Sequence, residues 1–82
     1  MDKQQIFEEI QKTMVTLFDL PKESITLESK LYEDLELDSI DAVDLVVQLQ
    51  KWMNKKINPE SFKSVRTVDD VVNAIAQLMQ SE

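Results

Sequence analysis

Residues 38–53 read DSIDAVDLVVQLQKWM, and this stretch predicts the amphipathic helix around which the rest of the chain is organised. Asp38 is a good N-cap, and Asp41 stands three residues later, where a capping box has its second polar side chain. At helical spacing the polar residues form one stripe: Asp41, Asp44, Gln48, Lys51 and Lys55. The residues expected to face the core are Ala42, Leu45, Val46, Leu49, Trp52 and Met53, with Ile40, Val43 and Val47 on the flank between these faces.

The residues before this helix predict another helix followed by a long loop. Apolar residues recur every three or four positions from Ile6 to Phe18 and predict a helix over residues 2–18. Pro21 disfavours helix at the residue before it, so we expect the helix to stop there. Residues 19–38 show no sustained period, which predicts a loop with a helical turn near 29–34. Aliphatic side chains should pin this loop to the core: Ile25, Leu27, Leu31, Leu35 and Leu37.

Two shorter patterns follow. Asn58-Pro59 predicts the start of a short helix that ends near Val65 and buries Phe62 and Val65. Thr67, with Asp70 three residues later, predicts the cap of a last helix. The apolar face of that helix consists of Val68, Val71, Val72, Ile75, Leu78 and Met79. Residues 1–82 are therefore expected to form a single all-α domain, a four-helix bundle with three long helices, one short helix and a long first loop.

The composition excludes several classes of function. The chain has no cysteine and no histidine, which rules out disulfides, thiolate metal sites and histidine-based catalysis by its own residues. A net charge of −7 disfavours binding to nucleic acid. The first residues lack a signal peptide's basic start and apolar stretch, and no apolar run approaches the roughly 20 residues of a membrane span. We therefore expect a cytoplasmic protein.

A calcium loop is the metal site that the acidic residues suggest, and it fails in detail. Asp34, Glu36 and Asp38 fall at positions 1, 3 and 5 of an EF-hand pattern. Ser39 then stands where the pattern requires glycine, and Leu45 where it requires a bidentate glutamate. The sequence predicts no defined metal site; loose binding of a divalent ion to the acidic cluster is the alternative.

The segment Asp34-Leu35-Glu36-Leu37-Asp38-Ser39-Ile40-Asp41 resembles the acyl carrier protein family, whose signature is Asp-Ser followed by an aliphatic residue at the start of the second helix. Residues 31–35, 40–45 and 67–71 resemble the family's approach loop, recognition helix and last helix. The resemblance implies that a phosphopantetheinyl transferase attaches 4′-phosphopantetheine from coenzyme A to Ser39, with Asp38 as the flanking motif residue. It also implies a carrier rather than an enzyme, without catalytic residues of its own. The alternative is that Ser39 is an ordinary serine at the start of a helix, with or without a part in capping it.

The charge around Ser39 is one-sided. Six carboxylates and no base occur within the twelve residues 33–44. They suggest a docking surface for basic patches on ketosynthases, acyltransferases and other acyl-processing enzymes, although a charge run is also simply a solvated face. The residues expected to dock are Glu36, Ile40, Asp41, Val43, Asp44 and Val47. For Ile40, Val43 and Val47, core packing is an equal alternative. We expect a monomer.

Two departures from the family pattern bear on the partner enzymes, the first on the transferase and the second on the pathway. Glu36 and Leu37 stand where the family usually has a glycine and a small residue, which should stiffen the loop. Lys51, Lys55 and Lys56 make the end of the second helix basic, where fatty-acid carriers stay acidic. This favours a polyketide-like or other specialised lipid pathway over general fatty acid synthesis, although the lysines also suit the helix dipole. The alternative function is a non-carrying acidic interaction module that binds a basic protein.

Overall fold

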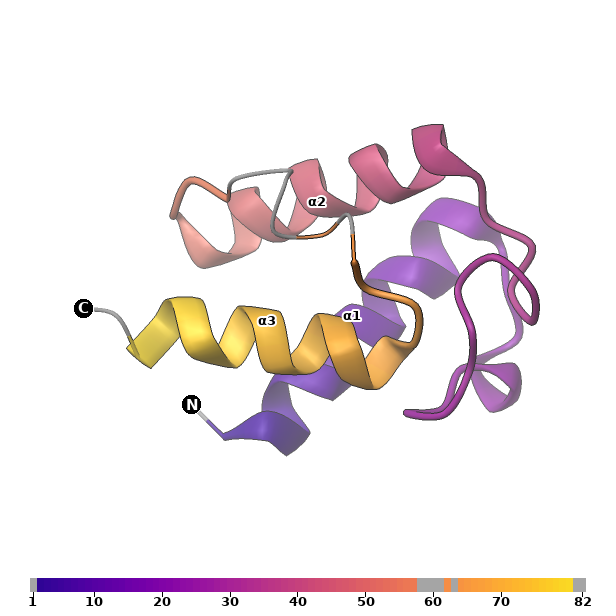
Figure 1. The fold of residues 1–82 in the computed structure, drawn as a ribbon, viewed down its shortest axis with the longest axis horizontal. Helices are drawn as coiled ribbons and strands as arrows, with labels where there is room; N and C mark the ends of the chain where they lie inside the picture. Colours follow the sequence, from indigo (N-terminus) through magenta and orange to yellow (C-terminus); the bar gives the residue numbers. More distant parts are fainter. Residues whose placement is uncertain (1, 58–61, 63, 81–82) are drawn as a thin grey trace.

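The computed structural model describes residues 2–57, 62 and 64–80, and their regular elements are all helical (Figure 1). The three α-helices are α1 (Lys3–Phe18), α2 (Ser39–Met53) and α3 (Val68–Gln80). A 3₁₀ turn that was not predicted, η1 (Lys22–Ser24), follows α1. These elements confirm the all-α fold class and the three long helices. The short helix expected to start at Asn58-Pro59 lies outside the described residues, but Phe62 and Val65 are buried as predicted.

Each α-helix begins with a reciprocal capping pair, in which two residues three apart bond each other's backbone N–H. The pair on α1 is Asp2 with Gln5, so the helix starts one residue later than expected. The pair on α3 is Thr67 with Asp70: the Asp70 N–H donates to Thr67 Oγ1, and the Thr67 N–H donates to Asp70 Oδ2, both at 3.2 Å. These bonds satisfy N–H groups that have no intrahelical acceptor, so each helix start is set locally.

Two of the helices end in residues with left-handed backbone. Asp19 follows α1 with φ 54°, and Asn54 follows α2 with φ 55°. This position usually holds glycine, which the chain lacks, and Asn and Asp are the other residues that tolerate it best. Helix α1 therefore stops at the predicted residue, Phe18, before Pro21 exerts any effect. Lys55, expected at the end of the polar stripe of α2, lies beyond the helix.

The core is an apolar cluster to which all three helices contribute. Helix α1 packs against both α2 and α3. The buried helical side chains are Ile6, Ile10 and Met14 of α1, Leu45, Val46 and Leu49 of α2, and Val68, Val71, Val72 and Ile75 of α3. Six residues expected in the core are less buried. Trp52, Met53, Leu78 and Met79 are half-buried at its edge, Ala42 is half-buried on α2, and Leu27 is 39% exposed.

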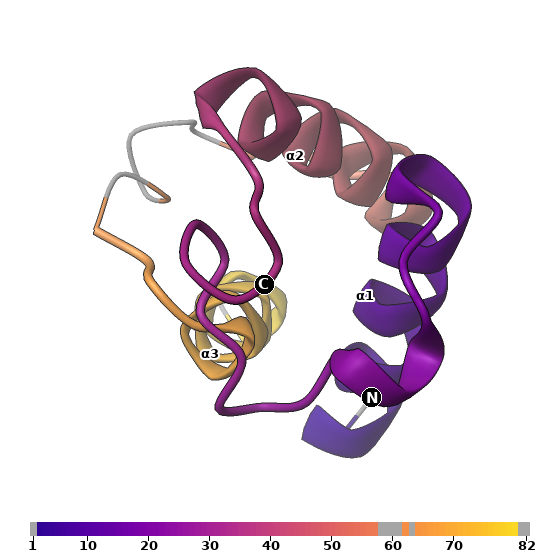
Figure 2. The same ribbon diagram turned by 90° about the vertical axis from the view of Figure 1, so that its right-hand side faces the viewer.

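The connection between α1 and α2 crosses one end of the bundle and is tied to the start of α3 (Figure 2). Its backbone bonds the segment that precedes and begins α3: the Leu31 N–H donates to the Arg66 carbonyl at 2.8 Å, and the Val68 N–H donates to the Ser29 carbonyl at 3.0 Å. Of the five aliphatic side chains predicted to pin it to the core, four are buried: Ile25, Leu31, Leu35 and Leu37. A hydrogen-bonded turn occupies residues 31–34, as the sequence predicts. The connection is therefore an ordered segment that leads to Ser39.

Candidate functional site

The chain approaches Ser39 along a path that two buried leucines hold in place. Leu35 and Leu37 point into the core, and the Leu37 N–H donates to the Leu31 carbonyl at 3.0 Å. Between them, Glu36 is exposed and has φ 56°, in the left-handed region. A non-glycine residue there costs roughly 1–2 kcal/mol. Glycine adopts this conformation without the steric penalty, which gives a physical reason why the family that the sequence resembles usually has glycine at this position.

Ser39 is the first residue of α2, and its side chain is exposed. It does not cap the helix, because Asp38 does: Asp38 Oδ1 accepts from the Asp41 N–H at 2.9 Å. Asp41 in turn accepts from the Asp38 N–H at 3.2 Å through Oδ2. Within the described part of the chain, no residue hydrogen-bonds the Ser39 hydroxyl. Ser39 is therefore not the capping residue of α2, and its side chain faces solvent.

The acidic residues around Ser39 differ in how far local structure engages them. Asp34 Oδ2 accepts from the Lys30 N–H at 2.8 Å, and Glu33 pairs with the Lys30 ammonium at 3.3 Å. Among the described residues, Glu36 and Asp44 have neither an ion pair nor a hydrogen bond to their side chains, and both are exposed. Because Glu36 and Asp44 have no partner in the part of the chain that the structure describes, they are the carboxylates of this cluster most available to a cation on another molecule.

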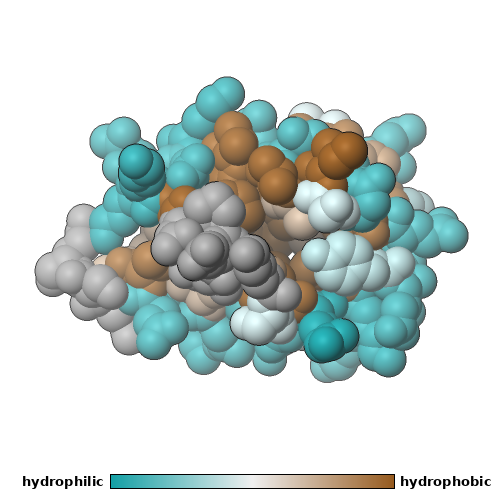
Figure 3. All heavy atoms as spheres, turned by 45° about the horizontal axis from the view of Figure 1, so that its top comes forward, coloured by the Kyte–Doolittle hydropathy of each residue, from teal (hydrophilic) through white to brown (hydrophobic). Residues whose placement is uncertain are grey.

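The flank of α2 is a stripe of exposed aliphatic side chains. Ile40 is 71% exposed, Val43 53% and Val47 38%, at helical spacings of three and four. The core-packing interpretation of these residues is therefore wrong. Figure 3 shows apolar side chains at the surface on the side of the molecule where α2 lies in Figure 1. Exposed apolar side chains arranged as a stripe, and not singly, are typical of an interaction surface.

The far end of α2 is basic. Lys51 and Lys56 are exposed, and the Lys55 ammonium donates to the Leu78 carbonyl of α3 at 3.2 Å. A surface hollow of about 420 Å³ lies at this end. It is lined by Val47, Gln50, Lys51, Asn54, Lys55 and Lys56. The apolar stripe therefore reaches the basic end directly through Val47.

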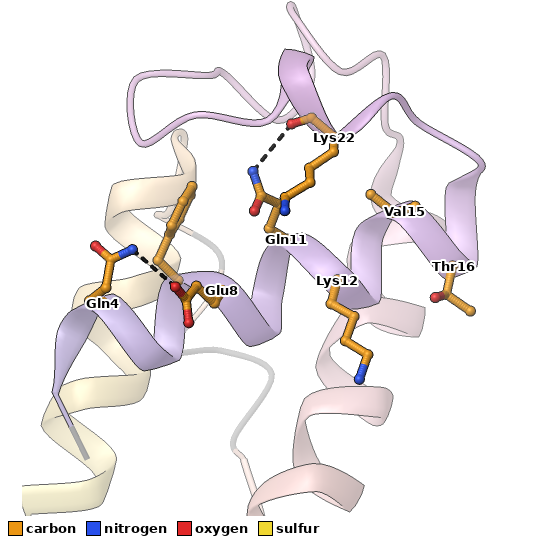
Figure 4. A pocket seen from close by; sticks show the side chains of 8 residues that line it. Gln4, Glu8, Gln11, Lys12, Val15, Thr16 and Lys22 are labelled. Carbon is orange, nitrogen blue, oxygen red and sulfur yellow. Dashed lines mark hydrogen bonds between the residues drawn. The ribbon is translucent and has the colours of Figure 1, made fainter.

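A larger hollow of about 610 Å³ lies along α1, and no residue of α2 lines it (Figure 4). Gln11 crosses it to donate to the Lys22 carbonyl at 3.2 Å, which fixes η1 against the helix. Gln4 and Glu8 bond each other along its rim at 3.3 Å. Sequence reasoning missed this hollow because Gln11 acts through a contact eleven residues away. Its lining contains neither Ser39 nor the α2 stripe, so it does not belong to the candidate site.

In the described ranges, no three or more acidic side chains converge in a way that would hold a metal ion. No helix formed by those residues is long and apolar enough to cross a bilayer.

Known proteins similar to this chain identify its family. Residues 8–75 match the family model described as the phosphopantetheine attachment site. The chain is 44% identical to Acyl carrier protein 2 of Ralstonia nicotianae over 79 residues, which are 96% of this chain and 98% of that relative. The chain belongs to the acyl carrier protein family. The resemblance seen in the sequence is confirmed, and the cofactor of this domain is 4′-phosphopantetheine.

Other members of the family are similar over most of the chain. An acyl carrier protein of Phytoplasma australiense is 40% identical over 67 residues, 82% of this chain and 88% of the relative. One of Saccharopolyspora erythraea is 33% identical over 79 residues, 96% of this chain and 83% of the relative. Membership in the family implies that a phosphopantetheinyl transferase and synthase-type enzymes act on the acyl carrier protein.

Proposed function

We propose that Ser39 is the attachment residue for 4′-phosphopantetheine, flanked by Asp38, and that residues 1–82 form a single carrier domain without catalytic residues of its own. The observation that supports this assignment is the exposed Ser39 hydroxyl, which no described residue hydrogen-bonds. It stands within the Asp38–Asp41 segment that resembles the family signature and inside the range matched by the family model.

The start of α2 suits a phosphodiester. The N–H groups of Ser39 and Ile40 lie in the first turn, where a helix has no carbonyl to bond them. The third N–H of the helix is occupied by Asp38, and the Ala42 N–H donates to the Asp38 carbonyl at 3.0 Å. Two N–H groups and the positive end of the helix dipole therefore remain for the phosphate. The dipole contributes about 0.3–1 kcal/mol, which helps the anion to sit among the nearby carboxylates.

The division of labour follows from the composition. When attached, 4′-phosphopantetheine supplies a flexible arm that ends in a thiol, and this thiol holds an acyl chain as a thioester. The chain itself has no cysteine or histidine, so the chemical steps belong to partner enzymes. Ser39 anchors the arm, and the buried Leu35 and Leu37 keep the anchor at a fixed position on the bundle. A rigid anchor on a small domain presents the acyl chain to each partner in turn.

The proposed docking surface combines charge with apolar contact. The acidic members are Glu36, Asp41 and Asp44, and the apolar members are Ile40, Val43 and Val47. The carboxylates would meet basic patches on a phosphopantetheinyl transferase, a ketosynthase or an acyltransferase, chiefly by speeding encounter and setting orientation. Because exposed charges are screened beyond about 8–10 Å at physiological salt, association should weaken as salt rises. We further propose a cytoplasmic monomer in a specialised or polyketide-like lipid pathway, with general fatty acid biosynthesis as the alternative.

Intact mass tests the attachment. The chain is co-expressed with a broad-specificity phosphopantetheinyl transferase, and we expect a gain of one phosphopantetheinyl group. Ser39→Ala should abolish the gain, while Ser64→Ala, at another exposed serine, should retain it. A gain in Ser39→Ala, or no gain in the wild type with several transferases, would overturn the assignment.

The exposed α2 stripe also suits the second candidate function, an interaction module that carries no arm. That function predicts that Ser39→Ala retains activity in cells, while charge reversal at Asp41 and Asp44 abolishes it. The carrier function predicts instead that the single substitution Ser39→Ala is sufficient to abolish activity. Complementation of a deletion strain with each variant distinguishes the two functions.

A further inference from the structure

The exposed surface of α2 changes character along the helix. Around Ser39 and over the first two turns it presents the carboxylates of Glu36 and Asp44 together with Ile40 and Val43, and Val47 follows in the middle of the helix. At the far end it presents the ammonium groups of Lys51 and Lys56. Val47 and both lysines line the same hollow, so the apolar and basic parts form one continuous surface.

Helix-dipole compensation accounts for only part of this basic end. Lys51 lies in the last turn of α2, where a cation is favoured. Lys55 bonds the Leu78 carbonyl near the end of α3, so it has a structural role in joining two helices. Lys56 lies three residues beyond the last residue of α2, past the range over which the dipole acts strongly. Neither effect explains why the exposed Val47 adjoins these lysines.

The two charged ends are far enough apart to act separately. Asp44 and Lys51, the nearest members of the two ends, are seven helical residues apart, about 10 Å along the axis at 1.5 Å per residue, which exceeds the Debye length of about 8 Å at physiological salt. A partner therefore meets an acidic patch and a basic patch rather than their average. A uniformly basic partner would be attracted at one end and repelled at the other, and such like-charge contact disfavours wrong partners.

We infer that the enzyme partner of this carrier has a tripartite docking face: a basic patch beside Ser39, an apolar centre over Val43 and Val47, and an acidic patch opposite Lys51 and Lys56. This inference rests on the proposed carrier function and specifies the partner's surface. The acidic patch is the part that discriminates, because it accepts this chain and repels carriers whose α2 is acidic throughout.

A second copy of the chain is the other occupant that the charges allow. Two antiparallel α2 helices would pair acidic ends with basic ends around the apolar stripe. However, the stripe consists of only three aliphatic side chains, whereas stable dimers bury roughly 1,200 Å² or more in total. A separate enzyme, which adds contacts to the arm and to the acidic cluster, is the favoured occupant.

The test compares two double charge reversals in the loaded protein. Lys51→Glu with Lys56→Glu alters the basic end of α2, and Lys3→Glu with Lys12→Glu makes the same charge change at exposed positions of α1. The probe is the condensing enzyme of the source organism that accepts the loaded wild type best, and the readout is kcat/KM. We expect the α2 double variant to lose about tenfold and the α1 double variant less than twofold. The rate of loading by the transferase serves as the control for the Ser39 end, and both variants should keep it within twofold.

Each other outcome counts against the inference. Equal losses in the two double variants, or a gain in the α2 double variant, would mean that the partner has no acidic patch at this end. Sedimentation of the loaded wild type as a dimer that the α2 double variant dissociates would assign the surface to a second copy. Intact mass is recorded first: a chain that receives no arm refutes the carrier function itself, whereas a loaded chain without the kinetic difference refutes only the tripartite face.

Discussion

Asp38 and Asp41 bond each other's backbone across the residue that we assign as the attachment site. The Asp41 N–H donates to Asp38 Oδ1 at 2.9 Å, and the Asp38 N–H donates to Asp41 Oδ2 at 3.2 Å. Both carboxylates flanking Ser39 are therefore committed to starting α2, and the hydroxyl between them has no bond to a described residue. The same pair that defines the first turn of the helix also keeps Ser39 exposed at its N-terminus.

Removing this cap should weaken the helix start. We expect Asp38→Ala to lower the free energy of unfolding by about 0.5–2 kcal/mol, because the Asp41 N–H loses its acceptor. Asp38→Asn keeps an accepting oxygen and should cost much less. Urea denaturation followed by circular dichroism measures both. Equal losses in the two variants would show that charge, and not the cap geometry, provides the stabilisation.

Glycine at position 36 should relieve backbone strain. Glu36 has φ 56°, a conformation that glycine adopts without the steric penalty. We expect Glu36→Gly to raise the free energy of unfolding by about 0.5 kcal/mol, the relief being partly offset by the entropy of glycine in the unfolded chain. Glu28, which is exposed in the same loop with negative φ, provides the matched control. Glu28→Gly should lower the free energy of unfolding. If Glu36→Gly lowers it as well, Glu36 is not strained.

Leu37 should contribute far more to stability than Leu27 in the same loop. Leu37 is 6% exposed and Leu27 is 39% exposed. We expect Leu37→Ala to lower the free energy of unfolding by about 2–3 kcal/mol through lost burial and a residual cavity, and Leu27→Ala by less than about 1 kcal/mol. Urea unfolding midpoints at constant m-value test the difference. Similar losses would contradict the proposed anchoring of the segment before Ser39.

Asp70 should make stability depend on pH in the acid range. Hydrogen bonds from the Arg66 and Thr67 N–H groups hold the pKa of the Asp70 carboxyl below its ordinary value of 3.8. The folded state thus favours the carboxylate, and this contribution is complete above the unfolded pKa and lost as pH falls through the lowered folded pKa. Free energies of unfolding measured between about pH 5 and pH 2 should show a smaller fall in Asp70→Asn than in wild type. An equal fall in the two proteins would contradict the role of Asp70.

The α2 stripe should matter for partners and not for stability. Ile40 is 71% exposed, so we expect Ile40→Ser to change the free energy of unfolding by less than about 0.5 kcal/mol. The same variant should lower kcat/KM with a condensing enzyme several-fold, because the apolar contact is lost. Val46→Ser, at a buried position of the same helix, should instead lower stability by more than about 1 kcal/mol. Unchanged kcat/KM in Ile40→Ser would remove Ile40 from the docking surface.

Much of the fold follows from interactions between residues close in sequence. The helix starts at Asp38 and Thr67 depend on partners three residues away, and the core faces depend on spacings of three and four. The left-handed conformation of Asn54 after α2 could also have been predicted from the sequence, because a chain without glycine must end its helices with other residues. Glu36 gave no such signal, because nothing about a glutamate indicates φ above zero.

The sequence by itself determined that Ser39 opens a capped helix beside clustered acids, because capping and helical periodicity act over a few residues. It could not determine whether Ile40, Val43 and Val47 are covered, since that depends on which side of α2 meets α1 and α3. The tertiary structure decided that they are exposed, and it placed the Lys55 ammonium on the Leu78 carbonyl, 23 positions away. Burial and long-range contact depend on how the helices pack together, which local preferences do not specify.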